Sequence, residues 1–204
     1  LPIAGLDVPG GRPRLAFGAP LPAGARGEAE LVEVWLLERL PLWRVRAALG
    51  ETLPAGYHWV RAEDVWLGAP ALAGQVAGAD WAVTVATVEG DEAIDRPRLS
   101  DAVAAVMGAD SIQRTRGKPG AEKPYDLRPL LVSVEVEEGS PDQTGPAAAR
   151  SGSIRLRMRT RLDPERGTGR PEEVVAALAE VAGIGLEIVE LVRSRLLLAS
   201  EPLD

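Results

Sequence analysis

The sequence contains no cysteine, and this absence excludes a whole set of functions. Disulfide bonds, thiolate zinc sites, iron–sulfur clusters and cysteine nucleophiles all need a thiol. Histidine is almost as scarce, because His58 in "GYHWV" is the only one. One imidazole is too few for a histidine-rich metal centre, and we interpret His58 as a packed or surface strand residue. We therefore predict no metal site and no cofactor.

Catalytic motifs and long hydrophobic runs are also missing. A lone histidine without a paired-carboxylate motif leaves few groups for acid–base or nucleophilic catalysis, which favours a non-catalytic protein over an enzyme. No apolar run reaches the roughly 20 residues that span a membrane. We expect a globular protein of the cytoplasm that has no membrane contact.

Charge is distributed unevenly along a chain whose formal net charge is −7. Residues 1–110 carry 9 Arg against 15 Asp and Glu, whereas residues 111–170 carry 12 Lys and Arg against 8 Asp and Glu. An acidic protein with a local basic segment is a candidate for specific anion recognition. Arginine supplies 21 of the 23 basic residues, and its planar fork suits phosphate. A GC-rich genome or heat adaptation produces the same bias, so composition alone leaves the choice open.

The first third of the chain predicts two strands, a helix and a third strand. The strands are expected over 14–17, within 27–39 and over 56–68, and helical spacing of apolar residues predicts a helix over 41–53. The small, uncharged stretch 69–79, "APALAGQVAGA", is typical of a linker.

The remainder predicts the order β, α, β, β, α, β. The first helix, "PRLSDAVAAVMGA", has Ser100 as its candidate N-cap, and the second opens at Pro171 and stops at Gly183. A polar loop is expected between the two central strands, over 139–152. This order is that of the ferredoxin-like split βαβ fold. We therefore predict an α+β protein with two tandem ferredoxin-like units: residues 1–68, which lack the first strand and helix, and a complete unit over 80–204.

Four arginines alternate with apolar residues and one threonine in "SIRLRMRTR", residues 153–161. A period of two places all four on one face of a strand. If the preceding strand, "VSVEVEE", pairs in register, then Glu137, Glu135 and Ser133 face Arg155, Arg157 and Arg159 in turn. Two arginines are then neutralised, whereas Arg159 and Arg161 have no acid opposite and remain available for an anion.

Two further basic clusters are candidates for anion or RNA binding. One is the early pair in "GRPRL", and the other is the glycine- and proline-rich segment "RTRGKPGAEKPYDLR", whose backbone amides and basic side chains suit phosphate. Asp126 in this segment has a position suited to a general base, but we favour a role in capping a turn or pairing with Arg128. The full set of candidate binding residues is Arg12, Arg14, Arg114, Arg116, Lys118, Lys123, Arg128, Arg159 and Arg161.

Four stretches in this order resemble the radical-SAM-linked family of uncharacterised proteins: "LPIAGLDVPGGRPRLAFGAPLPAG", "RTRGKPGAEKPYDLRPLL", "IRLRMRTR" and "RPEEVVAALAE…LVRSRLLL". Members of that family lie beside, or are fused to, B12-binding radical SAM proteins, often near genes for ribosomal proteins and a ribonuclease. They usually begin with a strand and a helix that carry a Ser-His-Leu-Asp type of motif, which is not present here. The resemblance implies a fold and a context but no catalytic residues.

Two hypotheses follow from the basic clusters and the resemblance. The first is a non-catalytic RNA-binding accessory subunit that presents tRNA or ribosomal RNA to a partner radical SAM enzyme. The second is a module that docks on that enzyme or on a ribosomal protein, with exposed tryptophans as anchors. The candidate anchors are Trp35, Trp43, Trp59 and Trp66, although buried core tryptophans would give the same pattern.

Overall fold

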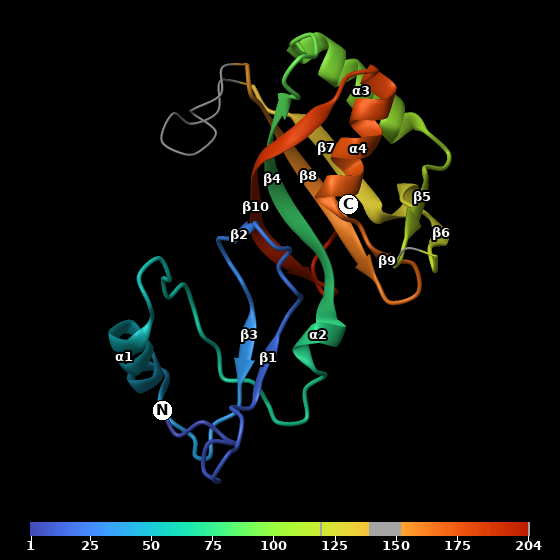
Figure 1. Ribbon diagram of the computed structural model, residues 1–204. Coiled ribbons are helices and arrows are strands. Elements are labelled where there is room, and N and C mark those ends of the chain that lie inside the picture. Colours follow the sequence, from blue (N-terminus) through green and yellow to red (C-terminus); the bar gives the residue numbers. More distant parts are fainter. Residues whose placement is uncertain (119, 139–151, 204) are drawn as a thin grey trace. The chain divides into compact units, whose positions relative to one another are not determined.

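The computed structural model describes residues 1–118, 120–138 and 152–203, so most of the predicted polar loop lies outside the described residues (Figure 1). The described residues form a mixed α+β fold with several sheets and four α-helices. They divide into two compact units: Leu1–Pro20 with Ala29–Gln75, here called unit 1, and Leu21–Glu28 with Val76–Asp204, here called unit 2. Each unit is described by itself.

Unit 1 has little regular structure. Strands β1 (Leu15–Phe17) and β3 (Val32–Val34) pair antiparallel, and the helices are α1 (Leu42–Thr52) and α2 (Leu72–Gln75). Helix α2 begins beside this pair, because the backbone N–H of Leu72 donates to the Glu33 carboxylate at 3.2 Å. Helix α1 contains no buried residue.

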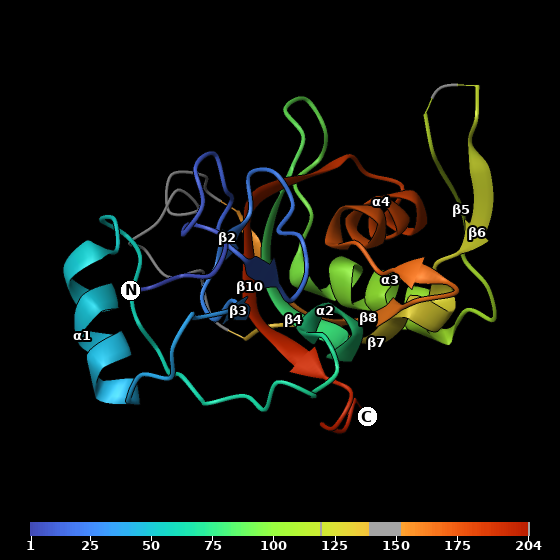
Figure 2. The ribbon, with the colours of Figure 1, turned by 90° about the horizontal axis from the view of Figure 1, so that it is seen from below.

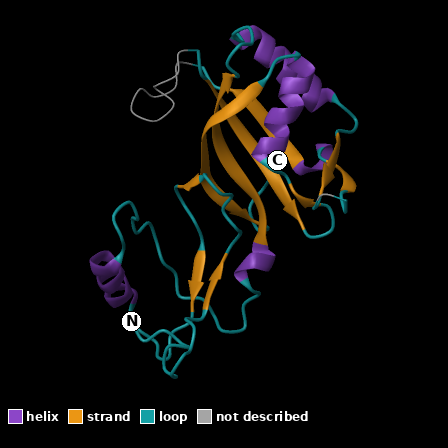
Figure 3. Cartoon of the chain, in the orientation of Figure 1, coloured by secondary structure: helices purple, strands orange, loops and turns teal. Residues whose placement is uncertain are grey.

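The prediction of a strand over 56–68 is wrong. Residues 53–71 form no helix or strand, and Figure 3 shows this stretch as loop between α1 and α2. A strand needs a neighbour that satisfies its backbone groups, and periodicity cannot tell whether such a neighbour exists. With only two short paired strands in unit 1, the tandem ferredoxin-like arrangement is not confirmed.

Unit 2 is built on a twisted sheet with the strand order β2-β10-β4-β8-β7, and β9 pairs with the end of β8. Its strands are β2 (Arg26–Gly27), β4 (Val76–Thr87), β7 (Leu131–Val136), β8 (Ile154–Asp163), β9 (Gly167–Thr168) and β10 (Leu186–Leu198). Strand β2 runs parallel to β10, and the other pairs are antiparallel. The residues predicted as a linker, 69–79, contain α2 and the start of β4.

Helices α3 (Arg96–Gly108) and α4 (Pro171–Ala182) lie side by side on one face of this sheet (Figures 1 and 2). Apolar side chains of both helices meet those of the sheet, and Leu99, Leu178 and Leu156 have no exposed surface. Because burial of such side chains is the main source of stability, this interface is the core of unit 2.

The helix ends follow the local sequence. Helix α3 starts earlier than predicted, because Asp95 caps it by accepting from the backbone N–H of Arg98 at 2.9 Å; Ser100 lies inside the helix. Helix α4 begins at Pro171 and ends at Gly183, whose φ of 65° is the left-handed conformation that favours glycine.

A hairpin that was not predicted lies between α3 and β7. Strands β5 (Gln113–Arg116) and β6 (Lys123–Asp126) pair antiparallel, and the short 3-10 helix η1 (Arg128–Leu130) then leads into β7. The hairpin extends beyond α3 and α4 in Figure 2. The basic segment of the sequence is therefore largely a β-hairpin.

Candidate functional site

Strand β8 separates its side chains as the period of two predicts. Ile154, Leu156 and Met158 are at most 4% exposed, whereas the arginines between them lie on the opposite face and are half-buried or exposed. The helices cover the apolar side of the sheet. The basic side is the face of the sheet that faces away from them.

The predicted register between β7 and β8 is confirmed. Ser133 lies opposite Arg159 and Glu135 opposite Arg157, and the Glu137 N–H donates to the Arg155 carbonyl at 2.9 Å. The ion pairs differ from the expectation in one respect. Glu137 pairs with both neighbours, at 3.3 Å to Nε of Arg155 and 2.9 Å to Nη2 of Arg157, so Arg157 uses Glu137 and not Glu135.

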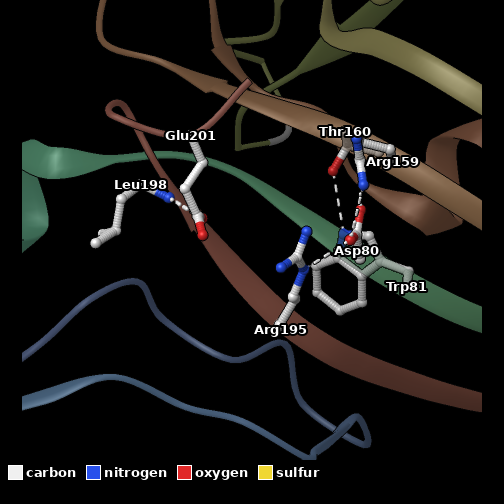
Figure 4. Close-up of polar contacts among 7 residues, drawn as sticks. All are labelled: Asp80, Trp81, Arg159, Thr160, Arg195, Leu198 and Glu201. Carbon is white, nitrogen blue, oxygen red and sulfur yellow. Dashed lines mark hydrogen bonds and ion pairs between the residues drawn. The ribbon is translucent and has the colours of Figure 1, made fainter. Parts of the chain in front are cut away.

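The prediction that Arg159 has no acid partner is wrong. Asp80, opposite it on β4, accepts from Nε of Arg159 at 2.7 Å and from Nη2 at 3.1 Å (Figure 4). Nε of Arg195, on β10, donates to the same carboxylate at 3.1 Å. At Arg159, strand β8 has two neighbours, β7 and β4, and the acid partner of Arg159 comes from β4, which is distant in the sequence.

Asp80 is held in its charged form by these two arginines. Burial raises the pKa of the carboxyl, but the hydrogen bonds from Arg159 and Arg195 outweigh burial, so its pKa lies below the ordinary 3.8. The same hydrogen bond raises the pKa of Arg159. A guanidinium that already donates from Nε and Nη2 to a carboxylate has lost its bidentate edge for a phosphate and keeps only part of its donor set.

Three buried side chains with polar groups, Trp81, Thr160 and Arg193, lie on the opposite, helix-covered face of the same strands. The indole N–H of Trp81 donates to Oγ1 of Thr160 at 3.1 Å (Figure 4), and the guanidinium of Arg193 lies 5.5 Å from the centre of the Trp81 ring. Arg193 is only 2% exposed. Sequence reasoning missed these residues, and alternation along β10 would not have found them, because a register shift between Arg193 and Arg195 separates two arginines that a period of two places on one face.

Arg161, at the far end of the arginine row, is half-buried and lies opposite Gly78. It forms no ion pair with any residue in the described ranges. Arg159 and Arg161 are both predicted from the sequence to be available for an anion, and of the two only Arg161 lacks an acidic partner among the described residues.

The hairpin uses both of its arginines to attach to α4. Nη2 of Arg114 lies 3.1 Å from the Glu180 carboxylate, and Nη2 of Arg116 lies 2.5 Å from that of Glu173. Arg116 also donates to the Thr168 carbonyl at 2.9 Å, and its guanidinium lies 4.4 Å from the centre of the Tyr125 ring. These contacts lie on the helix side of the sheet and not on the arginine face of β8.

Tyr125 completes the attachment by donating its hydroxyl hydrogen to Glu173. Burial, followed by this hydrogen bond, raises the pKa of Tyr125 from 10.0 to about 12. The tyrosine therefore stays protonated at every physiological pH. Its ring is half-buried, and the guanidinium of Arg116 occupies one of its faces.

Asp126 has the structural role that we favoured. One carboxylate oxygen accepts from the backbone N–H of Ile112 at 2.7 Å and from that of Arg128 at 3.0 Å. Burial raises its pKa, but these two hydrogen bonds have the larger combined effect and lower it. Asp126 caps a turn, and Arg128 donates to the Leu131 carbonyl at 3.2 Å.

The lysines of the hairpin differ from its arginines. Lys118 and Lys123 are exposed, and neither forms an ion pair with a residue that the structure describes. In unit 1, the guanidinium of Arg14 lies 4.7 Å from the centre of the Trp35 ring, and Arg12 is exposed without an ion pair to the described residues.

The candidate tryptophan anchors divide into two pairs. Trp43 is 72% exposed and Trp66 is 79% exposed, whereas Trp35 and Trp59 are half-buried. Both exposed tryptophans belong to unit 1.

Within the described residues, no group of three His, Cys, Asp or Glu side chains is arranged to hold a metal ion. None of the helices in the described ranges has the length and apolar character needed to cross a membrane.

These features define a mixed α+β protein with an ion-paired arginine face and a basic hairpin. A family model matches residues 11–171, and its description is "Uncharacterized protein conserved in bacteria (DUF2344)". The chain belongs to this family. No curated protein matches the chain.

Proposed function

We propose that the protein is a non-catalytic accessory subunit that presents an RNA, tRNA or ribosomal, to a partner radical SAM enzyme. Such a subunit needs two surfaces, one for the enzyme and one for the RNA. The link to radical SAM enzymes is supported by the sequence resemblance. The presence of two surfaces is supported by the distribution of exposed apolar and basic side chains.

One observation carries the proposal: large exposed apolar side chains are concentrated in unit 1, whereas both lysines of the chain, which form no ion pair in the described ranges, belong to unit 2. Most of the strongly exposed large apolar side chains in the described residues belong to unit 1, and those of unit 2 are Leu21, Val88 and Val181. Aromatic anchors such as Trp43 and Trp66 favour protein interfaces. Lys118, Lys123 and Arg161, which have no ion pair in the described ranges, belong to unit 2. We assign the enzyme to unit 1 and the RNA to unit 2.

The fold of unit 2 is compatible with this assignment. The order β4, α3, β7, β8, α4, β10, with spatial order β10-β4-β8-β7, is that of a ferredoxin-like unit, which we propose for this half of the chain. A sheet with one face under helices leaves its other face and its inserted hairpin for a ligand.

The proposal is tested by isolating the protein from its native cell after crosslinking and identifying the proteins and RNA attached to it. A radical SAM enzyme together with RNA is the expected result, and affinity for that RNA should fall steeply with salt, because lysines and arginines that contact phosphates displace counterions. Recovery of neither partner would refute the proposal.

A docking module without RNA is the second candidate, and the neutralised arginines favour it. Arg114, Arg116 and Arg159 each have an acidic partner within the chain, which removes a third of the nine predicted binding residues from consideration. Salt-insensitive association with the enzyme and no crosslinked RNA would support this candidate over the first.

A further inference from the structure

The hairpin β5–β6 combines two arginines that are neutralised by carboxylates with two exposed lysines. Lys118 and Lys123 are the only two lysines among 204 residues, and both lie at the apex, where Lys123 is opposite Arg116 in the register and Lys118 follows β5. A lysine ammonium is a compact, mobile point charge suited to a phosphate, unlike an arginine fork already held by a carboxylate. The two lysines are therefore the cations of this segment that a ligand can reach.

The hairpin is held along β5 by its two arginines. Arg116 reaches Glu173, Tyr125 and the carbonyl of Thr168, and Arg114 reaches Glu180, which lies two turns further along α4. The side chains of Arg116 and Glu173 are only a fifth to a quarter exposed, so water and salt screen this pair less than they screen surface pairs. The hairpin is thus a supported arm.

The turn of the arm is specified by glycine. Gly117 has a φ of 146°, and a Cβ atom at this position would lie 2.5 Å from the Ala121 carbonyl oxygen. Only glycine fits both conditions. The one carboxylate of the apex, Glu122, accepts from the Gly120 N–H at 3.0 Å, which directs it to the backbone of the turn.

The aromatic residues of unit 2 are poorly placed for base stacking. Tyr125 and Trp81 are the only aromatic residues in the sequence of this unit. Trp81 is 3% exposed, and Tyr125 is half-buried with the guanidinium of Arg116 over one face of its ring. Single-stranded RNA is recognised largely through bases stacked on exposed rings, whereas duplex RNA is recognised by shape and by backbone contacts.

We propose that the apex of the β5–β6 hairpin, through Lys118 and Lys123, contacts the phosphate backbone of a double-helical RNA segment. Arg114 and Arg116 anchor the arm and do not contact the RNA. This inference rests on the proposed RNA-presenting function and narrows it to a substrate class and a site.

The test uses the full chain, an RNA duplex of about 16 base pairs and a single strand of equal length, with affinity measured over a range of salt concentrations. Replacing Lys118→Gln and Lys123→Gln together should weaken duplex binding and reduce the salt slope by about two, one unit for each phosphate that the variant no longer neutralises. The control is the pair Arg44→Gln and Arg46→Gln, two exposed arginines of α1 that remove the same charge from unit 1. This control should leave the slope unchanged.

Each outcome bears on a different claim. If the wild type binds the duplex but the lysine variant keeps its affinity and slope, the site is wrong and the RNA function stands. If the wild type prefers the single strand, the substrate class is wrong. If the wild type binds neither RNA, the proposed function itself fails. Labelling of the two lysines by an amine-selective reagent gives a second measurement, and the duplex should protect both.

Discussion

At the scale of single residues, the fate of each arginine depends on acids that are distant in the sequence. Arg159 is 79 residues from Asp80, and Arg116 is 57 residues from Glu173. Local sequence shows that a strand has a basic face, but only the neighbouring strands show whether that face is neutral. An arginine row therefore supports RNA binding only after its partners are known.

Asp80 provides the clearest residue-scale prediction. Asp80→Asn removes the charge between Arg159 and Arg195, whose side chains are 25% and 50% exposed, and should lower the free energy of unfolding by about 1 to 2 kcal/mol near neutral pH. Because the pKa of Asp80 is lowered in the folded state, its contribution is present above the ordinary pKa of 3.8 and is lost as pH falls through the folded value.

Denaturant unfolding at several pH values measures this effect. The difference in the free energy of unfolding between wild type and Asp80→Asn should therefore become smaller as the pH falls. Asp110→Asn, at an exposed aspartate, is the control and should have no comparable effect. A gap that stays constant down to strongly acidic pH would show that the ion pairs do not stabilise the fold.

At the scale of elements, a periodic pattern of apolar residues predicts a helix or strand. An element that is held in place by side chains distant in the sequence is not predicted. The strands β4, β7, β8 and β10 and the helices α3 and α4 are predictable because each buries an apolar face against the others. The β5–β6 hairpin escapes prediction because "QRTR" and "KPYD" have no apolar alternation. Its attachment comes from Glu173 and Glu180 on α4, which local sequence cannot supply. The opposite error occurs over 56–68, which reads as a strand but pairs with no strand among the described residues.

The hairpin attachment predicts a titration. Glu173→Gln should bring the pKa of Tyr125 down from about 12 towards 10.0, because the variant loses the charge that the phenolate would have to face. It should also accelerate amide exchange in β5 and β6 by about tenfold, the effect of one hydrogen bond to a charged group. Because this pKa is raised, the stabilisation by Tyr125 is present below pH 10 and is lost as pH rises towards 12.

Ultraviolet absorbance of the phenolate and hydrogen exchange measure the two effects. Glu172→Gln is a matched control, because Glu172 is exposed and lies in the same first turn of α4. If Glu172→Gln and Glu173→Gln had the same effect on the pKa of Tyr125 and on amide exchange in β5 and β6, Glu173 would act only through its charge at the N-terminus of α4.

At the scale of the whole molecule, the two units differ in what stabilises them. Unit 2 has a continuous core beneath α3 and α4. In unit 1, the apolar side chains that are buried are those of Ala19 and Leu72, at 7% and 9% exposure. Helix α1 has 11 residues and buries none, and isolated helices of this length are marginal in water. Such a unit has little to offset its conformational entropy.

The last prediction follows from this imbalance. In the isolated protein, backbone amides of residues 1–20 and 29–75 should exchange much faster than those of β4, because local stability follows buried apolar contact. Binding of the partner enzyme should slow exchange in these segments, as expected for a surface that gains its core from a partner.

Trp43→Ala with Trp66→Ala should reduce this protection and weaken the association, since both side chains are more than 70% exposed and aromatic anchors dominate interface energies. Val181→Ala, at an exposed apolar position of unit 2, should change neither. Unit 1 amides that are as well protected as β4 without any partner would show that unit 1 is stable alone, and the docking surface would then have to be sought on unit 2.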